Sequence, residues 1–277
     1  MNETAAPGLV AAGGSRFDPD VPHAARVYNF WLGGKDNFLA DRKAAREVMR
    51  ARPQVVEGAR ANRSFLARVV RYLAAEVGIR QFLDIGTGLP APDSTHEVAQ
   101  SVARDCRIVY ADNDSLVLAH ARALLTGTRE GACSYVDADV RDTSTILAQA
   151  AQTLDFTQPV AVLLLAILHL IPEADSPAAI VARLAEGLAP GSYVAISHMT
   201  ADFAPDAVAA AADAYNALAP IAITARSHTE ATALFGRLPL VAPGVVPITE
   251  WRPDRPCQLA QPADLYAGLA RTPARGR

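Results

Sequence analysis

The chain contains few of the residues that cross-link a fold or hold a metal. Its 277 residues include three cysteines, Cys106, Cys133 and Cys257, and six scattered histidines, with no Cys or His pair at the spacing of a metal site. An odd, sparse set of cysteines argues against a disulfide framework and is typical of a reducing compartment. The sequence therefore predicts neither a structural zinc site nor a disulfide-stabilised fold.

Long apolar runs are missing as well. The longest one, Val160–Leu168, has about half of the ~18 residues that a membrane span needs. The N-terminus lacks the basic segment followed by an apolar segment that marks a secretory signal peptide. We therefore expect a cytoplasmic protein that does not associate with a membrane.

Lysine is scarce, and the basic residues are unevenly distributed along the chain. Of the 26 basic residues only Lys35 and Lys43 are lysines, the net charge is -3, and the pI is about 6.1. A general nucleic-acid binder carries a basic surface, so this balance disfavours a nucleic-acid partner. Residues 1–80 hold 13 basic and 8 acidic groups, whereas residues 81–277 hold 13 and 21. The first third either presents cations to an anionic group or consists of solvated helix faces. Composition does not indicate an oligomeric state.

Apolar residues make up 51% of the chain, which is enough for a large core, and their spacing divides the chain into three parts. Residues 1–18 are Ala/Gly-rich and predict a flexible tail, and residues 19–78 predict an N-terminal helical cap. From residue 79 to 277 short apolar runs alternate with helical stretches, which is the signature of a parallel α/β sheet. The helices expected in the cap are Arg26–Leu32, Leu39–Arg52 and Val55–Val77.

The expected strands of the α/β part are Gln81–Ile85, Arg107–Ala111, Ser134–Val136, Val160–Leu165 and Tyr193–Ser197, with 238–241 and 245–248 as two late strands whose direction, parallel or antiparallel, is open. The expected helices are Glu97–Arg104, Leu116–Leu125, Ser144–Gln152, Pro177–Leu188 and Asp206–Leu218.

The first strand ends in a candidate ligand-binding loop. In an open parallel sheet ligands bind beyond the carboxyl ends of the strands. Here Asp84 precedes Gly86, Thr87 and Gly88, and the two glycines allow a tight turn whose backbone N–H groups can approach a ligand. An isolated Gly-x-Gly is also compatible with an ordinary tight turn.

Acidic and polar residues follow the next two strands. Asp112 and Asn113 come after the second strand, and Asp112 lies 24 residues after Gly88, near the spacing of a carboxylate that binds a ribose diol. Asp139 and Val140 follow the third strand, where Asp139 is placed to accept from the amino group of adenine. Polar residues at three successive strand ends predict a cofactor that contains a nucleoside.

Two cofactors compete for this loop. The segment from Gly86 to Ala91 fits the G-x-G-x-x-A fingerprint of dinucleotide binding. However, Pro90 and Pro92 delay the helix whose N-terminus would bind pyrophosphate, and Asp84 would repel it. The Asp84 carboxylate suits the ammonium or sulfonium group of S-adenosyl-L-methionine, so charge favours the methyl donor over NAD.

Four stretches together resemble a known family. The run from Asp84 to Gly88 is similar to the first motif of class I S-adenosylmethionine-dependent methyltransferases. More specifically, the chain resembles the bacterial S-adenosyl methyltransferase family, formerly a domain of unknown function, and the resemblance covers roughly residues 18–255. It is carried by Arg26–Phe38, Ala61–Leu66, Phe82–Pro90 and Tyr110–Asp114.

The resemblance implies a Rossmann-like fold with a seven-stranded, mainly parallel sheet, helices on both faces and an N-terminal helical cap. It implies S-adenosyl-L-methionine as cofactor, and it leaves the methyl acceptor undefined. One departure is Pro90, which stands where the usual class I motif has a third glycine.

The cap offers further candidate ligands for the cofactor. Tyr28 belongs to a group of four aromatic residues within eleven positions, and an aromatic face attracts a sulfonium cation. These rings can equally anchor the cap. Among the cations, Arg26, Lys35 and Arg63 are candidates to bind the carboxylate of the cofactor.

His169 follows the fourth strand and is the candidate catalytic residue. A neutral imidazole near pH 7 can remove a proton from a methyl acceptor. A histidine at this position can also be a core or capping residue, and His198 after the fifth strand is a weaker candidate of the same kind. The sequence thus predicts a methyltransferase with a small-molecule acceptor; the alternatives are a non-catalytic S-adenosylmethionine-binding regulator and an NAD-dependent oxidoreductase.

Overall fold

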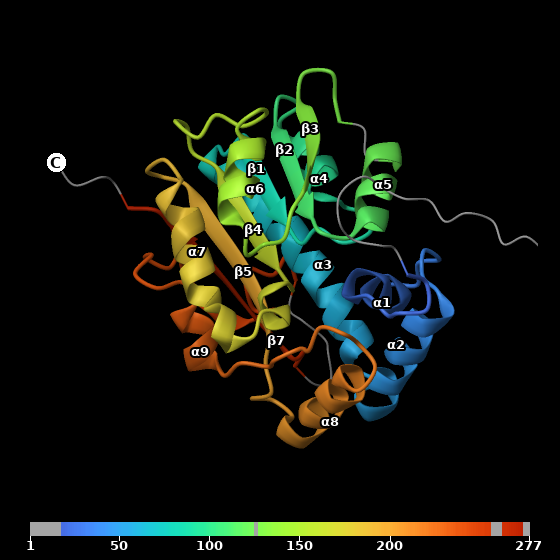
Figure 1. The fold of residues 1–277 in the computed structure, drawn as a ribbon. Helices are drawn as coiled ribbons and strands as arrows, with labels where there is room; N and C mark the ends of the chain where they lie inside the picture. Colours follow the sequence, from blue (N-terminus) through green and yellow to red (C-terminus); the bar gives the residue numbers. More distant parts are fainter. Residues whose placement is uncertain (1–17, 125–126, 256–261, 274–277) are drawn as a thin grey trace, which may run out of the picture.

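A computed structural model describes residues 18–124, 127–255 and 262–273, and these form a seven-stranded sheet with helices on both faces (Figure 1). The strand order is β3-β2-β1-β4-β5-β7-β6. β1 to β5 are parallel, whereas β7 runs antiparallel to both β5 and β6. The strands are β1 (Gln81–Ile85), β2 (Arg107–Asp112), β3 (Ala132–Asp137), β4 (Ala161–Leu165), β5 (Tyr193–Met199), β6 (Val246–Pro247) and β7 (Leu265–Arg271).

The strand order reverses between β1 and β4, and this reversal determines where a ligand can bind. From β1 the chain moves outward to β2 and β3, and then returns to β4 on the other side of β1. The loops that follow β1 and β4 therefore diverge to opposite faces and leave a crevice between them, which is the usual ligand position in such sheets. All residues of β1 and β4 are buried, as expected for central strands covered on both faces.

Alternate side chains of the strands pack in two hydrophobic cores, one on each face of the sheet. Phe82 and Ile108 pack with α3 (Val55–Arg71), its π-helical continuation Tyr72–Val77 and α4 (Thr95–Val102). Leu83 and Val109, one residue further along each strand, pack on the opposite face with α6 (Thr143–Ala150), α7 (Pro177–Glu186) and α9 (His228–Ala233). The period-two alternation of a strand produces this division. α5 (Ser115–Leu124) packs against β2 and β3.

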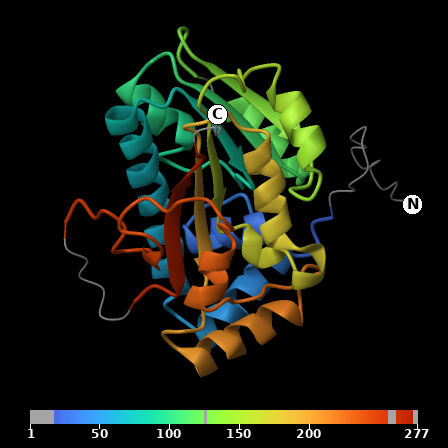
Figure 2. The ribbon, with the colours of Figure 1, turned by 90° about the vertical axis from the view of Figure 1, so that its left-hand side faces the viewer.

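A third, smaller core forms a roof over the carboxyl edge of the sheet. It joins α1 (Ala24–Trp31) and α2 (Leu39–Ala51) to α8 (Pro205–Asn216), which lies beside α2 although it is far away in the sequence (Figures 1 and 2). Its buried residues include Val48 of α2 and Tyr215 of α8. In the structure the roof thus combines the N-terminal cap with a helix from the C-terminal half, while α3 packs on the sheet.

The expectation for the end of the sheet was confirmed in part, since both late segments pair antiparallel with β7 but only over short stretches. Residues 238–241 form only an isolated bridge, between Leu240 and Ala270, and β6 is reduced to Val246–Pro247. The long antiparallel partner of β5 is β7, which the sequence did not indicate. Its sequence is Leu-Tyr-Ala-Gly-Leu-Ala-Arg, and alanine and glycine have low β-propensity, so tertiary pairing decides its conformation.

The tail predicted for residues 1–18 lies, except for Asp18, outside the described residues. Within the described ranges no helix combines the length and apolar character that a membrane crossing requires.

Candidate functional site

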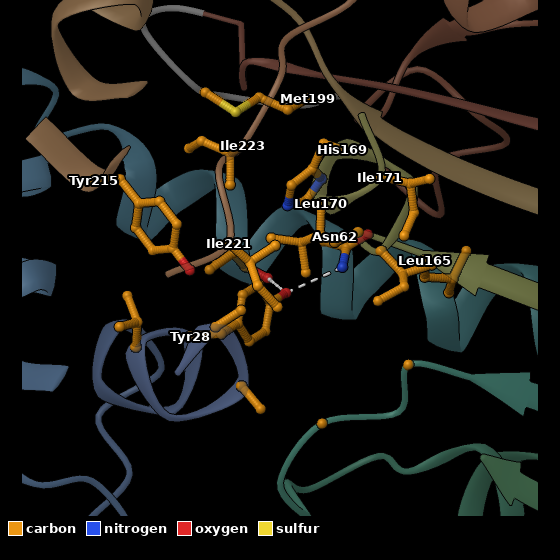
Figure 3. A pocket seen from close by; sticks show the side chains of 18 of the residues that line it. Tyr28, Asn62, Leu165, His169, Leu170, Ile171, Met199, Tyr215, Ile221 and Ile223 are labelled. Atoms are coloured by element: carbon orange, nitrogen blue, oxygen red, sulfur yellow. Dashed lines mark hydrogen bonds between the residues drawn. The ribbon is translucent and has the colours of Figure 1, made fainter. Parts of the chain in front are cut away.

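A cavity of about 450 Å³ lies at the carboxyl edge of the sheet, beneath the roof (Figure 3). This volume is within the ~300–1,000 Å³ range of small-molecule sites. The cavity brings together eleven of the residues that the sequence singled out: Tyr28, Arg63, Asp84, Gly86, Thr87, Gly88, Asp112, Asn113, Asp139, Val140 and His169.

Lys35 is the exception. It is exposed in the turn after α1 and does not line the cavity. Arg26, the other cap cation considered, is buried in the roof, where its Nη2 donates to the Val21 carbonyl oxygen at 2.7 Å and its Nε lies 3.5 Å from the Asp41 carboxylate. Of the three cations, only Arg63 reaches the cavity.

The glycine loop after β1 has the backbone that its sequence predicts. Gly86 and Gly88 have φ values of +71° and +66°, in the left-handed region that glycine tolerates best. A Cβ atom added to Gly86 would lie 2.7 Å from the side chain of Ile167, which follows β4. The Gly86 N–H donates to the carbonyl oxygen of Ala111 at the end of β2. The loop is therefore held closely between the segments that follow β2 and β4.

Asp112 closes the next side of the cavity. One of its carboxylate oxygens accepts from the Gly88 N–H and the other from the Asp114 N–H, both at 2.9 Å. Each oxygen keeps a lone pair, so the carboxylate can still accept two hydroxyl groups, as a ribose diol requires. Burial raises the pKa of Asp112. His23, which precedes α1, lies 3.0 Å from the Asp114 carboxylate and joins the roof to this edge.

Asp139 lies at the outer end of the cavity in a dense set of hydrogen bonds. Its oxygens accept from the backbone N–H, Nε and Nη2 of Arg141 and from Nδ2 of Asn113, at 2.7–3.0 Å. These bonds hold the pKa of Asp139 below its ordinary value. An adenine amino group can therefore bind Asp139 only by replacing a bond, and the exposed Asn113 amide is the partner that moves most easily. Val140 is buried beside it.

Asp84 and Arg63 place opposite charges at the inner end. Asp84 is buried and accepts from the Thr95 hydroxyl at 2.6 Å, and burial raises its pKa to about 6 even though the Arg63 charge opposes that shift. Arg63 uses Nη2 to donate to the carbonyl oxygens of Pro92 and Asp93, while its buried Nε has no hydrogen-bond partner within the described ranges. A carboxylate beside a guanidinium with an unused donor fits the ammonium and carboxylate of an amino-acid ligand.

Tyr28 faces the cavity in a fixed position. Its hydroxyl donates to the Ala59 carbonyl oxygen at 2.9 Å and accepts from Asn62 Nδ2 at 3.1 Å (Figure 3). The Ser197 hydroxyl of β5 donates to Asn62 Oδ1 at 2.6 Å. This chain ties α1 to α3 and to the end of β5. Asn62 had been noted only as part of a family-like stretch, because its partner Ser197 is 135 residues away.

His169 lies on the short 3-10 turn Leu168–Leu170 after β4, and its imidazole points into the cavity (Figure 3). Burial lowers its pKa to about 3, so the ring is neutral near pH 7. Among the described residues no hydrogen bond is made by either ring nitrogen, and Nδ1 is fully buried. No group in the described part of the protein therefore fixes its tautomer, and the nitrogen that faces the cavity can accept a proton from a ligand.

His198 has a different role. Its Nδ1 donates to the Met199 carbonyl oxygen at 2.7 Å, and its Nε2 accepts from Arg226 at 2.8 Å, so both ring nitrogens are occupied. Arg226 also donates to the carbonyl oxygens of Leu168 and Ile171, at 3.0 Å each. These bonds hold the turn that carries His169 from both sides. His198 is thus a buried structural residue.

The described part of the chain contains no cluster of three or more His, Cys, Asp or Glu residues that is arranged to hold a metal ion.

Comparison with known proteins identifies relatives over most of the chain. Residues 11–273 match the family described as S-adenosyl methyltransferase. A protein of the DUF574 family from Streptomyces avermitilis is 43% identical, with a TM-score of 0.90 over 93% of this chain and 100% of that one. A putative methyltransferase from Thermobifida fusca is 40% identical, with a TM-score of 0.85 over 92% and 96%.

A more distant structure shares the fold. Human N-acetylserotonin methyltransferase, solved in complex with S-adenosylmethionine, is 14% identical, with a TM-score of 0.50 over 92% of this chain and 64% of that one. A search of curated proteins finds no match.

Proposed function

Because the chain belongs to the S-adenosyl methyltransferase family, and is thus an S-adenosylmethionine-dependent methyltransferase, we propose that its cavity binds a small-molecule methyl acceptor next to the cofactor and uses His169 as the base. One observation carries this proposal. A single cavity contains both the glycine loop with its strand-end carboxylates and the imidazole of His169, which makes no hydrogen bond to any described residue.

The cofactor-binding end is assigned from the hydrogen-bonding capacity of its residues. Asp84 receives the ammonium group and Arg63 the carboxylate, since these side chains provide a buried negative charge and an unused donor. Asp112 accepts the ribose hydroxyls. The remaining assignments are the backbone of Gly86, Thr87 and Gly88 beside the amino-acid part, Asn113, Asp139 and Val140 beside adenine, and the ring of Tyr28 beside the sulfonium.

When bound, S-adenosylmethionine supplies a methyl group that is already activated on a sulfonium sulfur. The protein therefore needs to position the acceptor and exclude water rather than to provide a strong nucleophile. The roof formed by α1, α2 and α8 excludes water, and the Tyr28–Asn62–Ser197 chain keeps one wall of the cavity rigid.

His169 handles the proton. Its neutral imidazole accepts the proton that the nucleophilic atom of the acceptor loses, at the ring nitrogen that faces the cavity. The low pKa of His169 reflects the cost of adding a positive charge to a buried site. During methyl transfer the sulfonium charge disappears, so the imidazolium replaces a positive charge in the cavity and does not add one.

Calorimetry and a transfer assay test this proposal together. We expect S-adenosylmethionine and S-adenosylhomocysteine to bind and NAD(H) not to bind. In a screen of small molecules for labelled methyl incorporation, His169→Gln should reduce turnover while leaving the affinity for S-adenosylhomocysteine unchanged. Binding without turnover for any acceptor would instead favour the regulatory alternative, and full activity of His169→Gln would show that His169 is not the base.

A further inference from the structure

The cavity continues past His169 into a region that the cofactor assignment does not use. We call it the acceptor chamber, and define it by side chains from α1, β4 and its following turn, α8 and the segment after α8. These are Trp31, Leu165, Leu170, Tyr215, Ile221 and Ile223. Figure 3 labels all of them except Trp31, around one space with the His169 ring at its edge. All six side chains are aliphatic or aromatic, so the chamber is suited to an apolar ligand.

None of the six side chains that define the chamber is charged. Two charged residues, Arg52 directly after α2 and Asp264 directly before β7, also line the cavity. They neutralise each other in a two-point ion pair, with Nε–Oδ2 at 2.7 Å and Nη2–Oδ1 at 3.1 Å. An ionic acceptor would leave water without gaining a counter-charge, which is strongly unfavourable. Carboxylates, phosphates and protonated aliphatic amines are therefore poor ligands for the chamber.

Two polar groups face the chamber and can each form a further hydrogen bond. The His169 imidazole and the Tyr215 hydroxyl both lack a hydrogen-bond partner within the described part of the chain. Burial raises the pKa of Tyr215, so this hydroxyl stays protonated and can act as a donor. The neutral imidazole needs a donor from the ligand. A ligand hydroxyl satisfies it, and the rings of Trp31 and Tyr215 favour an aromatic body.

The roof also limits the size of the acceptor. Tyr215 and Ala211 of α8 pack against Val48 and Ala44 of α2 in the third core, directly above the chamber. This core covers the chamber on the α2–α8 side, which leaves less room for a polypeptide or nucleic-acid chain than for a small molecule. A small molecule only has to fit within the cavity.

We propose that the methyl acceptor is an uncharged aromatic compound with a phenol-type hydroxyl, bound in the acceptor chamber with that hydroxyl donating to His169. This inference rests on the proposed function. In the transfer, the hydroxyl oxygen forms the bond to the methyl carbon and the imidazole of His169 receives the hydroxyl proton. The electron pair of the broken carbon–sulfur bond stays with sulfur, so charge is conserved.

Three probes with the same ring system test the chemical class. Protein saturated with S-adenosylhomocysteine is titrated with 2-naphthol, with 2-naphthoate and with 2-naphthylmethylammonium, and binding is followed by calorimetry. We expect 2-naphthol to bind at least roughly ten-fold more tightly than either ion, which corresponds to about 1.4 kcal/mol. With S-adenosylmethionine in place of the product, 2-naphthol should acquire a labelled methyl group on oxygen.

A charge placed in the chamber should reverse this preference. Ile221 is 37% exposed, so Ile221→Lys is expected to fold, to lose affinity for 2-naphthol and to gain affinity for 2-naphthoate. Val102→Lys is the matched control, because Val102 is 39% exposed and lies outside the cavity. Both variants should bind S-adenosylhomocysteine as the unmodified protein does, which verifies folding.

The outcomes separate the two proposals. If S-adenosylhomocysteine binds but an ionic probe binds as well as 2-naphthol, or none of the three binds up to its solubility, the acceptor class is wrong while the proposed function stands. If S-adenosylhomocysteine itself does not bind, the proposed function fails and this inference fails with it.

Discussion

Replacing Asp84 by asparagine should stabilise the protein and weaken cofactor binding at the same time. The carboxylate is buried at the end of β1 and accepts a hydrogen bond from Thr95, and burial raises its pKa from the ordinary value of 3.8 to about 6. The folded protein thus holds the Asp84 proton more tightly than the unfolded chain does. Stability that is present at low pH is lost as the pH rises from about 3.8 through about 6.

The magnitude follows from the difference between these two pKa values. At about 1.36 kcal/mol per tenfold change in the proton-binding constant, ionised Asp84 lowers the free energy of unfolding by up to about 3 kcal/mol near neutral pH. Asparagine has nearly the same shape, still accepts from the Thr95 hydroxyl and carries no charge. Asp84→Asn should therefore raise the free energy of unfolding by up to about 3 kcal/mol at about pH 7.5, and by little at about pH 4.

The same substitution removes the negative charge assigned to the cofactor ammonium. A hydrogen bond to a charged group contributes about 1.5–3 kcal/mol, so the affinity for S-adenosylhomocysteine should fall by roughly ten-fold or more at neutral pH. In the unmodified protein the affinity should also fall as the pH drops through about 6, because Asp84 becomes protonated. This pH dependence should disappear in Asp84→Asn. His169 does not contribute to it, since its pKa of about 3 keeps the ring neutral over this range.

Urea denaturation at the two pH values and calorimetric titration provide the measurements. Asp155→Asn is the control, because Asp155 carries an exposed carboxylate at the opposite end of the sheet and lies outside the cavity. If Asp84→Asn is no more stable than the unmodified protein at about pH 7.5, burial does not disfavour the Asp84 charge. If its affinity for S-adenosylhomocysteine is unchanged, Asp84 does not bind the ammonium group.

Three further substitutions test the rest of the cofactor end. Asp112→Ala should weaken S-adenosylhomocysteine binding at least a few-fold, because it removes a charge-assisted hydrogen bond of about 1.5–3 kcal/mol. Asp137→Ala is the control, since Asp137 lies on the exposed end of β3 and its loss should not change this affinity. If calorimetry gives Asp112→Ala the same affinity as the unmodified protein, Asp112 is not the ribose ligand. Lys35→Ala should leave this affinity unchanged, since Lys35 does not line the cavity. Tyr28→Phe keeps the ring but removes the hydroxyl that accepts from Asn62 Nδ2 and donates to the Ala59 carbonyl oxygen, so thermal unfolding should show a loss of about 1 kcal/mol while binding is retained. A large loss of binding would mean that the hydroxyl itself contacts the cofactor.

Local pattern was enough to predict the parallel part of the fold. The expected strands at 81–85 and 160–165 differ from β1 and β4 by at most one residue, because central strands are continuous apolar runs bounded by turn residues. The Rossmann-like fold and the family were confirmed. The carboxyl ends of parallel strands meet at one edge, so residues that follow different strands, such as Asp84 and Asp112, were expected to converge there.

Pairings over long sequence distances could not be predicted in this way. β7 was missed because its alanines and glycine carry little β-propensity and only its pairing with β5 makes it a strand. Lys35 was selected for its charge within a distinctive segment, but the turn after α1 leaves it exposed and away from the cavity. Charge and position along the chain do not specify the direction of a side chain.

The sequence by itself determined which residues gather at the proposed cofactor end, because a glycine loop and strand-end carboxylates are short-range features that the parallel sheet gathers automatically. Only the tertiary structure decided the proposed acceptor chamber. The ion pair of Arg52 with Asp264 joins residues 212 positions apart, and the packing of Tyr215 over the chamber depends on α8 meeting α2. Each of these contacts forms between elements that only the complete fold brings together, so no local periodicity encodes them.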